Sequence, residues 1–200
     1  MNDYFLWNQF LCGNDKAYAT LYEKYVDVLF AYGMRFTPNR ELVKDCIQDV
    51  FVKIYIHRKS LTKTDNVKLY LFVALKNILF DYFKKNIDHL ENQQNGEEPV
   101  FDVEYPVEDQ MIAREHAQEQ TQMINRIMDT LTSRQKEAIY YRYVEGMNLE
   151  MICELMQMNY QSAQNLLQRS LKKLRTAITD KNTTLQFYIR KAKWIYSNQK

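Results

Sequence analysis

The chain has 200 residues and a mass of 24.1 kDa, which suits one large domain or two small ones. Its 27 basic and 25 acidic residues leave a net charge of +2, which excludes a uniformly basic nucleic-acid binder. There are only four glycines and three prolines. β-Sandwiches and βαβ folds need many tight turns, so this shortage excludes them and predicts an all-α protein.

Several classes of site have no support in the composition. The three cysteines and three histidines lie far apart, so we expect no metal site, and the scattered glycines form no phosphate-binding loop. No nucleophile–base pair is visible, so we expect a protein that is not an enzyme, needs no cofactor and takes no small-molecule substrate. No apolar run is long enough to span a bilayer and no secretion signal is evident, which predicts a cytoplasmic protein without membrane insertion.

Charge divides the chain into three zones. Residues 1–86 carry a net charge of +4, residues 87–130 a net charge of −9, and residues 131–200 a net charge of +7. The middle zone opens with a polar, acidic stretch, which we interpret as a linker. The predicted organisation is two small helical domains at 1–86 and 108–178, an acidic linker at 87–107, and a basic, aromatic extension at 179–200.

Apolar residues at helical spacing predict four helices in the first zone. The expected bounds are about 3–12, 15–32, 39–57 and 67–85, with a polar loop at 59–66. Thr37 is the expected cap of the third helix, with Pro38 at its first helical position. Tyr22 and Tyr82 are expected on the buried faces of the second and fourth helices.

The second basic domain has clear helix signals. Thr132, with Gln135 three residues later, forms a capping-box signature. Asn148 and Asn159 are the expected caps of the two helices that follow, and two short helices joined by a tight turn predict a helix-turn-helix. The expected helices of this domain span about 133–144, 149–156 and 160–175.

The last of these helices has an unusual outer face, made of amides and cations. No acidic residue occurs from Leu155 to Thr179. Gln, Asn and Arg pair with base edges, and Lys suits phosphates. A merely solvated face usually mixes Glu with Lys, so the missing carboxylates favour DNA binding over an ordinary exposed face. The candidate DNA-binding residues are Gln161, Ser162, Gln164, Asn165, Gln168, Arg169, Lys172 and Lys173.

Two other surfaces are ambiguous from spacing alone. The helix at 39–57 carries an acidic stripe, made of Glu41, Asp45, Gln48 and Asp49, away from its apolar residues. The stripe could meet a basic partner, although spacing alone favours an ordinary exposed face. The helix at 67–85 mixes cations with aromatics, a combination that suits single-stranded nucleic acid, but aromatics at this spacing are more often core.

Three short motifs, in this order, resemble a known family. Residues 45–51 read Asp-Cys-Ile-Gln-Asp-Val-Phe and are similar to the D-x-x-Q-D-V-F core-binding motif of sigma-70-family RNA polymerase sigma factors. Residues 131–146 resemble the start of the sigma region 4 domain, and residues 158–175 resemble its recognition helix. Length and domain count resemble the extracytoplasmic-function (ECF) group, which keeps only the region 2 and region 4 domains, and the recognition-helix variant looks most like the Bacteroidetes branch.

The resemblance implies a set of contacts. The protein would bind bacterial core RNA polymerase at the β′ clamp helices and the β flap and direct it to promoter DNA, with an anti-sigma factor as a further partner. The acidic stripe would meet the clamp helices, and the helix at 160–175 would enter the major groove at the −35 element. The −10 element would be melted and held by Lys59, Lys63, Asn66, Lys68, Lys76 and Asn77.

Other functions stay open from the sequence. A stand-alone helix-turn-helix regulator would bind its site without polymerase, but it gives the acidic stripe no role. A structural adaptor leaves the carboxylate-free helix unexplained. Within the resemblance, Gln157 stands where the family usually has glycine at the turn. The extension at 179–200 lies beyond the resemblance, and we expect it to pack on the second domain, with contact to an anti-sigma factor or a membrane surface as the alternatives.

Overall fold

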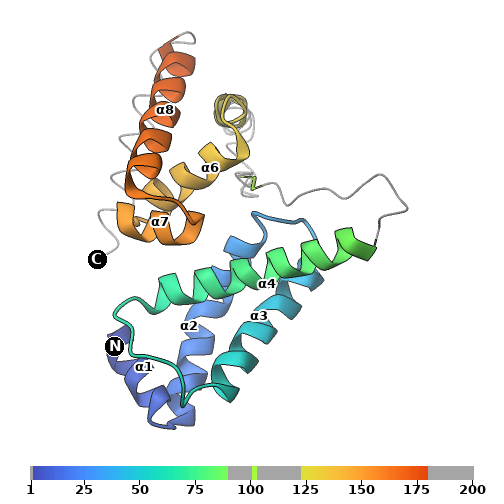
Figure 1. Ribbon diagram of the computed structural model, residues 1–200, viewed down its shortest axis with the longest axis vertical. Helices are drawn as coiled ribbons and strands as arrows, with labels where there is room; N and C mark the ends of the chain where they lie inside the picture. Colours follow the sequence, from blue (N-terminus) through green and yellow to red (C-terminus); the bar gives the residue numbers. More distant parts are fainter. Residues whose placement is uncertain (1, 90–100, 103–122, 180–200) are drawn as a thin grey trace, which may run out of the picture. The chain divides into compact units, whose positions relative to one another are not determined.

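The computed structural model describes residues 2–89, 101–102 and 123–179, and in these ranges the regular structure is entirely helical (Figure 1). The predicted all-α class is confirmed. The chain divides into two compact units. Most of the predicted acidic linker and of the basic, aromatic extension lies outside the described residues. Among the helices described, none is long and apolar enough to cross a membrane.

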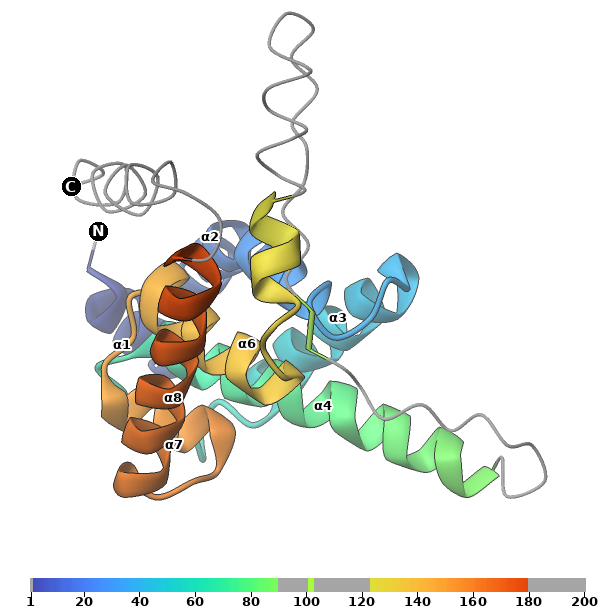
Figure 2. The same cartoon turned by 90° about the horizontal axis from the view of Figure 1, so that it is seen from above.

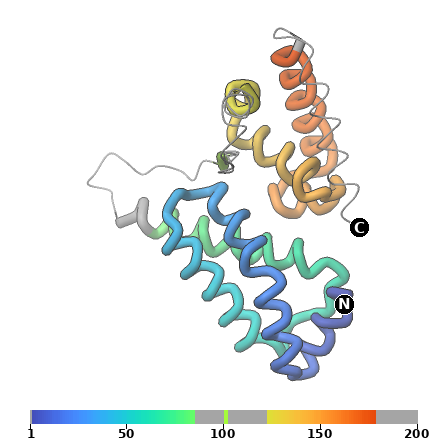
Figure 3. The backbone as a smooth tube through the Cα atoms, turned by 180° about the vertical axis from the view of Figure 1, so that it is seen from behind, coloured from blue at the N-terminus to red at the C-terminus, as the bar shows by residue number. Residues whose placement is uncertain are grey.

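The first unit is built from four helices. They are α1 (Asp3–Leu11), α2 (Asp15–Gly33), α3 (Arg40–Ile56) and α4 (Val67–His89). Figures 1 and 3 show α2 beside α3, with α4 lying across both. Tyr32 on α2 and Phe72 on α4 are fully buried and stack face to face, with ring centroids 4.1 Å apart. The core therefore forms where these three helices meet.

Asparagine side chains start the helices of this unit. Asn39 Oδ1 accepts the Leu42 N–H at 3.1 Å, so α3 begins at Arg40. The prediction of a Thr37 cap with Pro38 in the helix was wrong. Thr37 Oγ1 instead accepts the Asn39 N–H at 3.2 Å, which fixes the turn that precedes the cap.

Two tyrosines predicted to be buried are exposed. Tyr22 on α2 is 42% exposed and Tyr82 on α4 is 44% exposed, so both predictions were wrong. Tyr22 lies edge-on to Phe51, with ring centroids 4.9 Å apart, and therefore covers the core from outside. A tyrosine can occupy such a boundary because its ring is apolar while its hydroxyl can stay in water.

A two-residue segment far along the chain completes this unit. Phe101 is only 2% exposed, and its ring centroid lies 5.0 Å from that of Phe36. The Asp102 N–H donates to the Arg35 carbonyl at 2.8 Å. Nothing in the local sequence marks Phe101 as a core residue, because it lies in an acidic stretch without helical spacing, within the predicted linker. The chain nevertheless returns to the first unit after α4.

The C-terminal part of the chain contains a helix-turn-helix. The elements described there are a helical stretch at 123–128, α6 (Ser133–Ile139), the π-helix η1 (Tyr140–Val144), α7 (Leu149–Met156) and α8 (Tyr160–Thr179). The predicted capping box of Thr132 and Gln135 is confirmed. Asn148 and Asn159 accept the N–H groups of Met151 and Ser162, so both predicted caps are also confirmed. Figure 2 shows α6 beside α8.

The predicted helix at 133–144 changes type partway along. It is α-helical to Ile139 and then widens into a π-helix. The Tyr141 hydroxyl donates to Glu137 Oε1 at 2.7 Å, and the Tyr140 hydroxyl donates to Glu145. These bonds hold two large buried rings in consecutive positions, and a wider turn accommodates them.

The turn before α8 contains a residue in the left-handed region. Gln157 has a φ of +50°, where a side chain costs about 1–2 kcal/mol and glycine does not pay that cost. A glycine would avoid this strain, but it also gives the unfolded chain more conformational freedom, which lowers the free energy of unfolding by about 0.5–1 kcal/mol. We expect Gln157→Gly to raise the free energy of unfolding by about 0.5–1 kcal/mol, measured as a higher urea midpoint. Gln161→Gly, inside α8, is the matched control and should lower the midpoint; a lower midpoint for both variants would contradict the prediction.

Candidate nucleic-acid interface

The acidic stripe lies on the solvent side of α3. Glu41, Asp45, Gln48 and Asp49 are all exposed, because the residues between them fill the core. That buried face consists of Leu42, Val43, Cys46, Ile47, Val50, Phe51 and Ile54. The two sets interleave at helical spacing, so burying one set presents the other as a continuous strip.

Electrostatics support a negative potential along this strip. Burial is the main reason why the pKa of the Cys46 thiol is raised to about 11, and the nearby carboxylates of Asp49 and Asp45 contribute to the same shift. Lys44 donates to Glu41 at 2.7 Å, and this hydrogen bond and ion pair lower the pKa of Glu41. The stripe therefore presents its three carboxylates to solvent, as contact with a basic partner requires.

The predicted −10 residues fall into two groups. Lys59 and Lys63 are exposed on the loop that precedes α4, and Asn77 is exposed on α4 itself. Lys68 and Lys76 are half-buried over aromatic rings. Their Nζ atoms lie 5.5 Å from the Phe72 and Phe80 ring centroids, respectively.

Asn66, which was predicted to contact the −10 element, also caps a helix. Its Oδ1 accepts the Leu69 N–H at 3.0 Å and so caps α4. Its backbone N–H donates to Thr64 Oγ1 at 3.1 Å. Capping uses the side-chain oxygen and thereby fixes the orientation of the Asn66 amide at the end of the loop.

Helix α8 presents the predicted DNA-binding residues together. All are exposed except Asn165, which is half-buried, and Ala163, Leu167 and Ser170 lie on the opposite, buried face. Gln161 Nε2 donates to Asn165 Oδ1 at 3.2 Å, one turn along the helix. This bond holds two amides side by side on the outer face.

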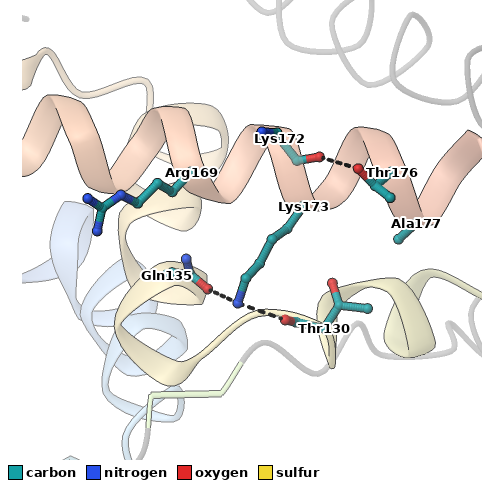
Figure 4. A pocket seen from close by; sticks show the side chains of 7 residues that line it. All are labelled: Thr130, Gln135, Arg169, Lys172, Lys173, Thr176 and Ala177. Atoms are coloured by element: carbon teal, nitrogen blue, oxygen red, sulfur yellow. Dashed lines mark hydrogen bonds between the residues drawn. The ribbon is translucent and has the colours of Figure 1, made fainter.

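Lys173 differs from the other cations of this helix. Its Nζ donates to Gln135 Oε1 at 3.0 Å and lies 3.4 Å from the Thr130 carbonyl (Figure 4). The same Gln135 oxygen accepts the Thr132 N–H at 3.1 Å in the capping box. Lys173 thus ties α8 to the start of α6, a link between distant residues that no sequence signal predicted.

An open groove of about 610 Å³ runs beside this link. Arg169, Lys172 and Lys173 on α8 supply its positive charge, and Thr130, Gln135, Thr176 and Ala177 line the rest (Figure 4). Its cations continue the positive face of α8 toward the C-terminal end of the helix. Arginine and lysine side chains in such a position suit phosphate groups.

Two family models match this chain. Residues 21–87 match Sigma-70 region 2, and residues 121–174 match Sigma-70, region 4. The first match contains the acidic stripe, the loop and most of α4, and the second contains the helix-turn-helix. Together they cover more than half of the sequence.

Similar proteins agree with these matches. The chain is 22% identical over 157 residues to the ECF RNA polymerase sigma factor SigM of Bacillus subtilis (strain 168), covering 78% of this chain and 91% of the relative. Its fold is similar to CnrH, solved in complex with the cytosolic domain of CnrY, with a TM-score of 0.58 and 17% identity over 91% of this chain and 100% of the other. It is also similar to the sigma factor RpoE in complex with the anti-sigma factor NepR from Bartonella quintana, with a TM-score of 0.60 and 17% identity over 84% and 99% of the two chains.

Proposed function

We propose that this chain, which belongs to the sigma-70 family of RNA polymerase sigma factors and to its ECF group, holds core polymerase through the acidic stripe and reads promoter DNA through two separate surfaces. The loop at 59–66 with α4 would melt and hold the −10 element, and α8 would read the −35 element in the major groove. Sigma factors direct initiation without catalysing a reaction, so the chain is not an enzyme.

One observation carries this division of labour. A single chain presents an exposed acidic strip on α3 and a helix, α8, whose outer face has no carboxylate. The first surface would repel DNA and the second would attract it, so they suit different partners. A stand-alone regulator that only binds DNA would leave the strip on α3 without a role.

Run-off transcription with purified bacterial core polymerase tests the proposal. Promoter-specific transcripts should appear only when this protein is added to core. Tight binding to duplex DNA without core, combined with no transcripts in its presence, would favour the stand-alone regulator instead.

Gln168 is our choice for a base-reading residue. It is exposed on α8, and a bidentate amide–base pair contributes about 1–3 kcal/mol of discrimination. We expect Gln168→Ala to relax the −35 preference at one position, measured by competition between promoter variants. Lys172→Ala is the matched control. It should weaken binding to all promoter variants equally, and the dependence of the binding constant on salt concentration should fall by the equivalent of about one phosphate contact. An unchanged preference in Gln168→Ala would assign the reading to another residue.

One further partner and a location belong to the same proposal. The solved RpoE structure contains an anti-sigma factor, and we propose that a protein of this kind controls the present chain as well. Because core polymerase and promoter DNA are the other proposed partners, the expected location is the cytoplasm. A pull-down of core polymerase subunits with the tagged chain would test the contact with core polymerase directly.

A further inference from the structure

The indole of Trp7 reaches from α1 to the loop that precedes α4. Trp7 is fully buried, and its Nε1–H donates to the Thr62 carbonyl at 3.1 Å, although the two residues are 55 positions apart. Thr62 lies in the middle of the loop at 59–66. A buried side chain of one helix therefore binds the backbone of a surface loop.

Packing fixes the direction of this donor. The Trp7 ring centroid lies 5.5 Å from that of Phe10 on α1 and 5.2 Å from that of Tyr70 on α4. The helix that carries it is itself attached to α2, since the Tyr25 hydroxyl donates to Asp3 at 2.7 Å. Contacts with two rings hold the indole in one orientation, so its N–H is a donor of fixed position for the loop backbone.

The ends of the loop are fixed by local bonds. The Ser60 N–H donates to the His57 carbonyl at 2.9 Å, and Asn66 caps α4 at the other end. The Trp7 bond holds the stretch between them, from the side of the core. Lys59 and Lys63 remain exposed, so the loop backbone is held while its cationic side chains face solvent.

We propose that Trp7 is a positioning residue for promoter melting, which it supports by holding the 59–66 loop in the conformation that captures the −10 element. This inference rests on the proposed function. A loop that is already ordered loses less conformational entropy when it captures an unstacked base. Trp7 itself is buried and so acts only through the loop.

Two replacements of Trp7 test this role. Trp7→Phe removes the N–H donor together with part of the ring, whereas 3-benzothienylalanine at position 7 keeps the bicyclic shape and lacks the N–H. One hydrogen bond corresponds to a roughly 2- to 10-fold effect, so we expect both replacements to slow opening of a duplex promoter by that factor. Affinity for core polymerase should stay unchanged, and a template with a premelted −10 region should restore most of the activity.

Leu29→Ala is the matched control, because it also truncates a fully buried side chain of this unit and leaves both rings that pack on Trp7 in place. It should open the duplex promoter at nearly the wild-type rate. Wild-type opening by the benzothienylalanine protein would overturn the inference. Equal loss on duplex and premelted templates would also overturn it, because it would indicate a defect in folding or in core binding. Absence of promoter-specific transcripts with the wild-type protein would instead refute the proposed function, and the inference with it.

Discussion

Asp49→Arg is expected to abolish stable binding to core polymerase while leaving the helical fold intact. Asp49 is exposed at the C-terminal end of the acidic stripe, with Asp45 one turn before it on the same helix. The substitution removes an attractive charge and adds a repulsive one at the surface proposed to meet basic residues. Close charge pairs across interfaces couple by about 1.5–7 kcal/mol, so we expect an affinity loss of roughly 100-fold or more.

Fluorescence titration of labelled protein with core polymerase measures this loss, and circular dichroism checks the fold. Exposed substitutions usually change stability by less than about 0.5 kcal/mol, so the melting curve should stay close to that of the wild type. Asp27→Arg is the matched control, since Asp27 is an exposed acidic residue on α2 outside the stripe. If Asp27→Arg lost as much affinity as Asp49→Arg, net charge rather than the stripe would govern binding.

The features that could be predicted from the sequence are those set by contacts between residues close together in the chain. Thr132 with Gln135, Asn148 and Asn159 mark helix starts through side chains that bond within three residues, and all three caps are present. Thr37 and Asn39 show the limit of such signals. Both are good capping residues two positions apart, and only the backbone geometry decides that Asn39 caps α3.

The features that sequence could not predict connect distant residues. Phe101 is buried against Phe36, and Lys173 bonds to Gln135, yet neither residue stands in a pattern that distinguishes it from its neighbours. The candidate surfaces themselves were predictable, because an exposed stripe is the complement of a buried helical face. The contacts that hold those surfaces in place were not, since they depend on how separate helices pack.

Gly33→Ala is expected to destabilise the first unit, although Gly→Ala inside a helix ordinarily stabilises a protein by about 0.5–1 kcal/mol. A Cβ at Gly33 on α2 would lie only 2.6 Å from Val43 Cγ1 on α3 and 3.6 Å from Leu75 Cδ2 on α4. Val43 and Leu75 are fully buried, so neither can swing into solvent. Overpacking of this kind typically costs about 1–3 kcal/mol, which for a unit of this size lowers Tm by about 4 °C or more.

Shortening the side chain opposite Gly33 distinguishes this steric clash from any other effect of the added methyl group. Val43→Ala alone should destabilise through the cavity it leaves, but Gly33→Ala added to it should cost little, because the methyl group then has room. The double-mutant cycle therefore predicts a strong favourable coupling between positions 33 and 43. Since α3 carries the acidic stripe, the single variant should also weaken binding to core polymerase, and Val43→Ala should reverse part of that loss. A higher Tm for Gly33→Ala, or strictly additive effects at the two positions, would show that α2 and α3 do not approach this closely in solution.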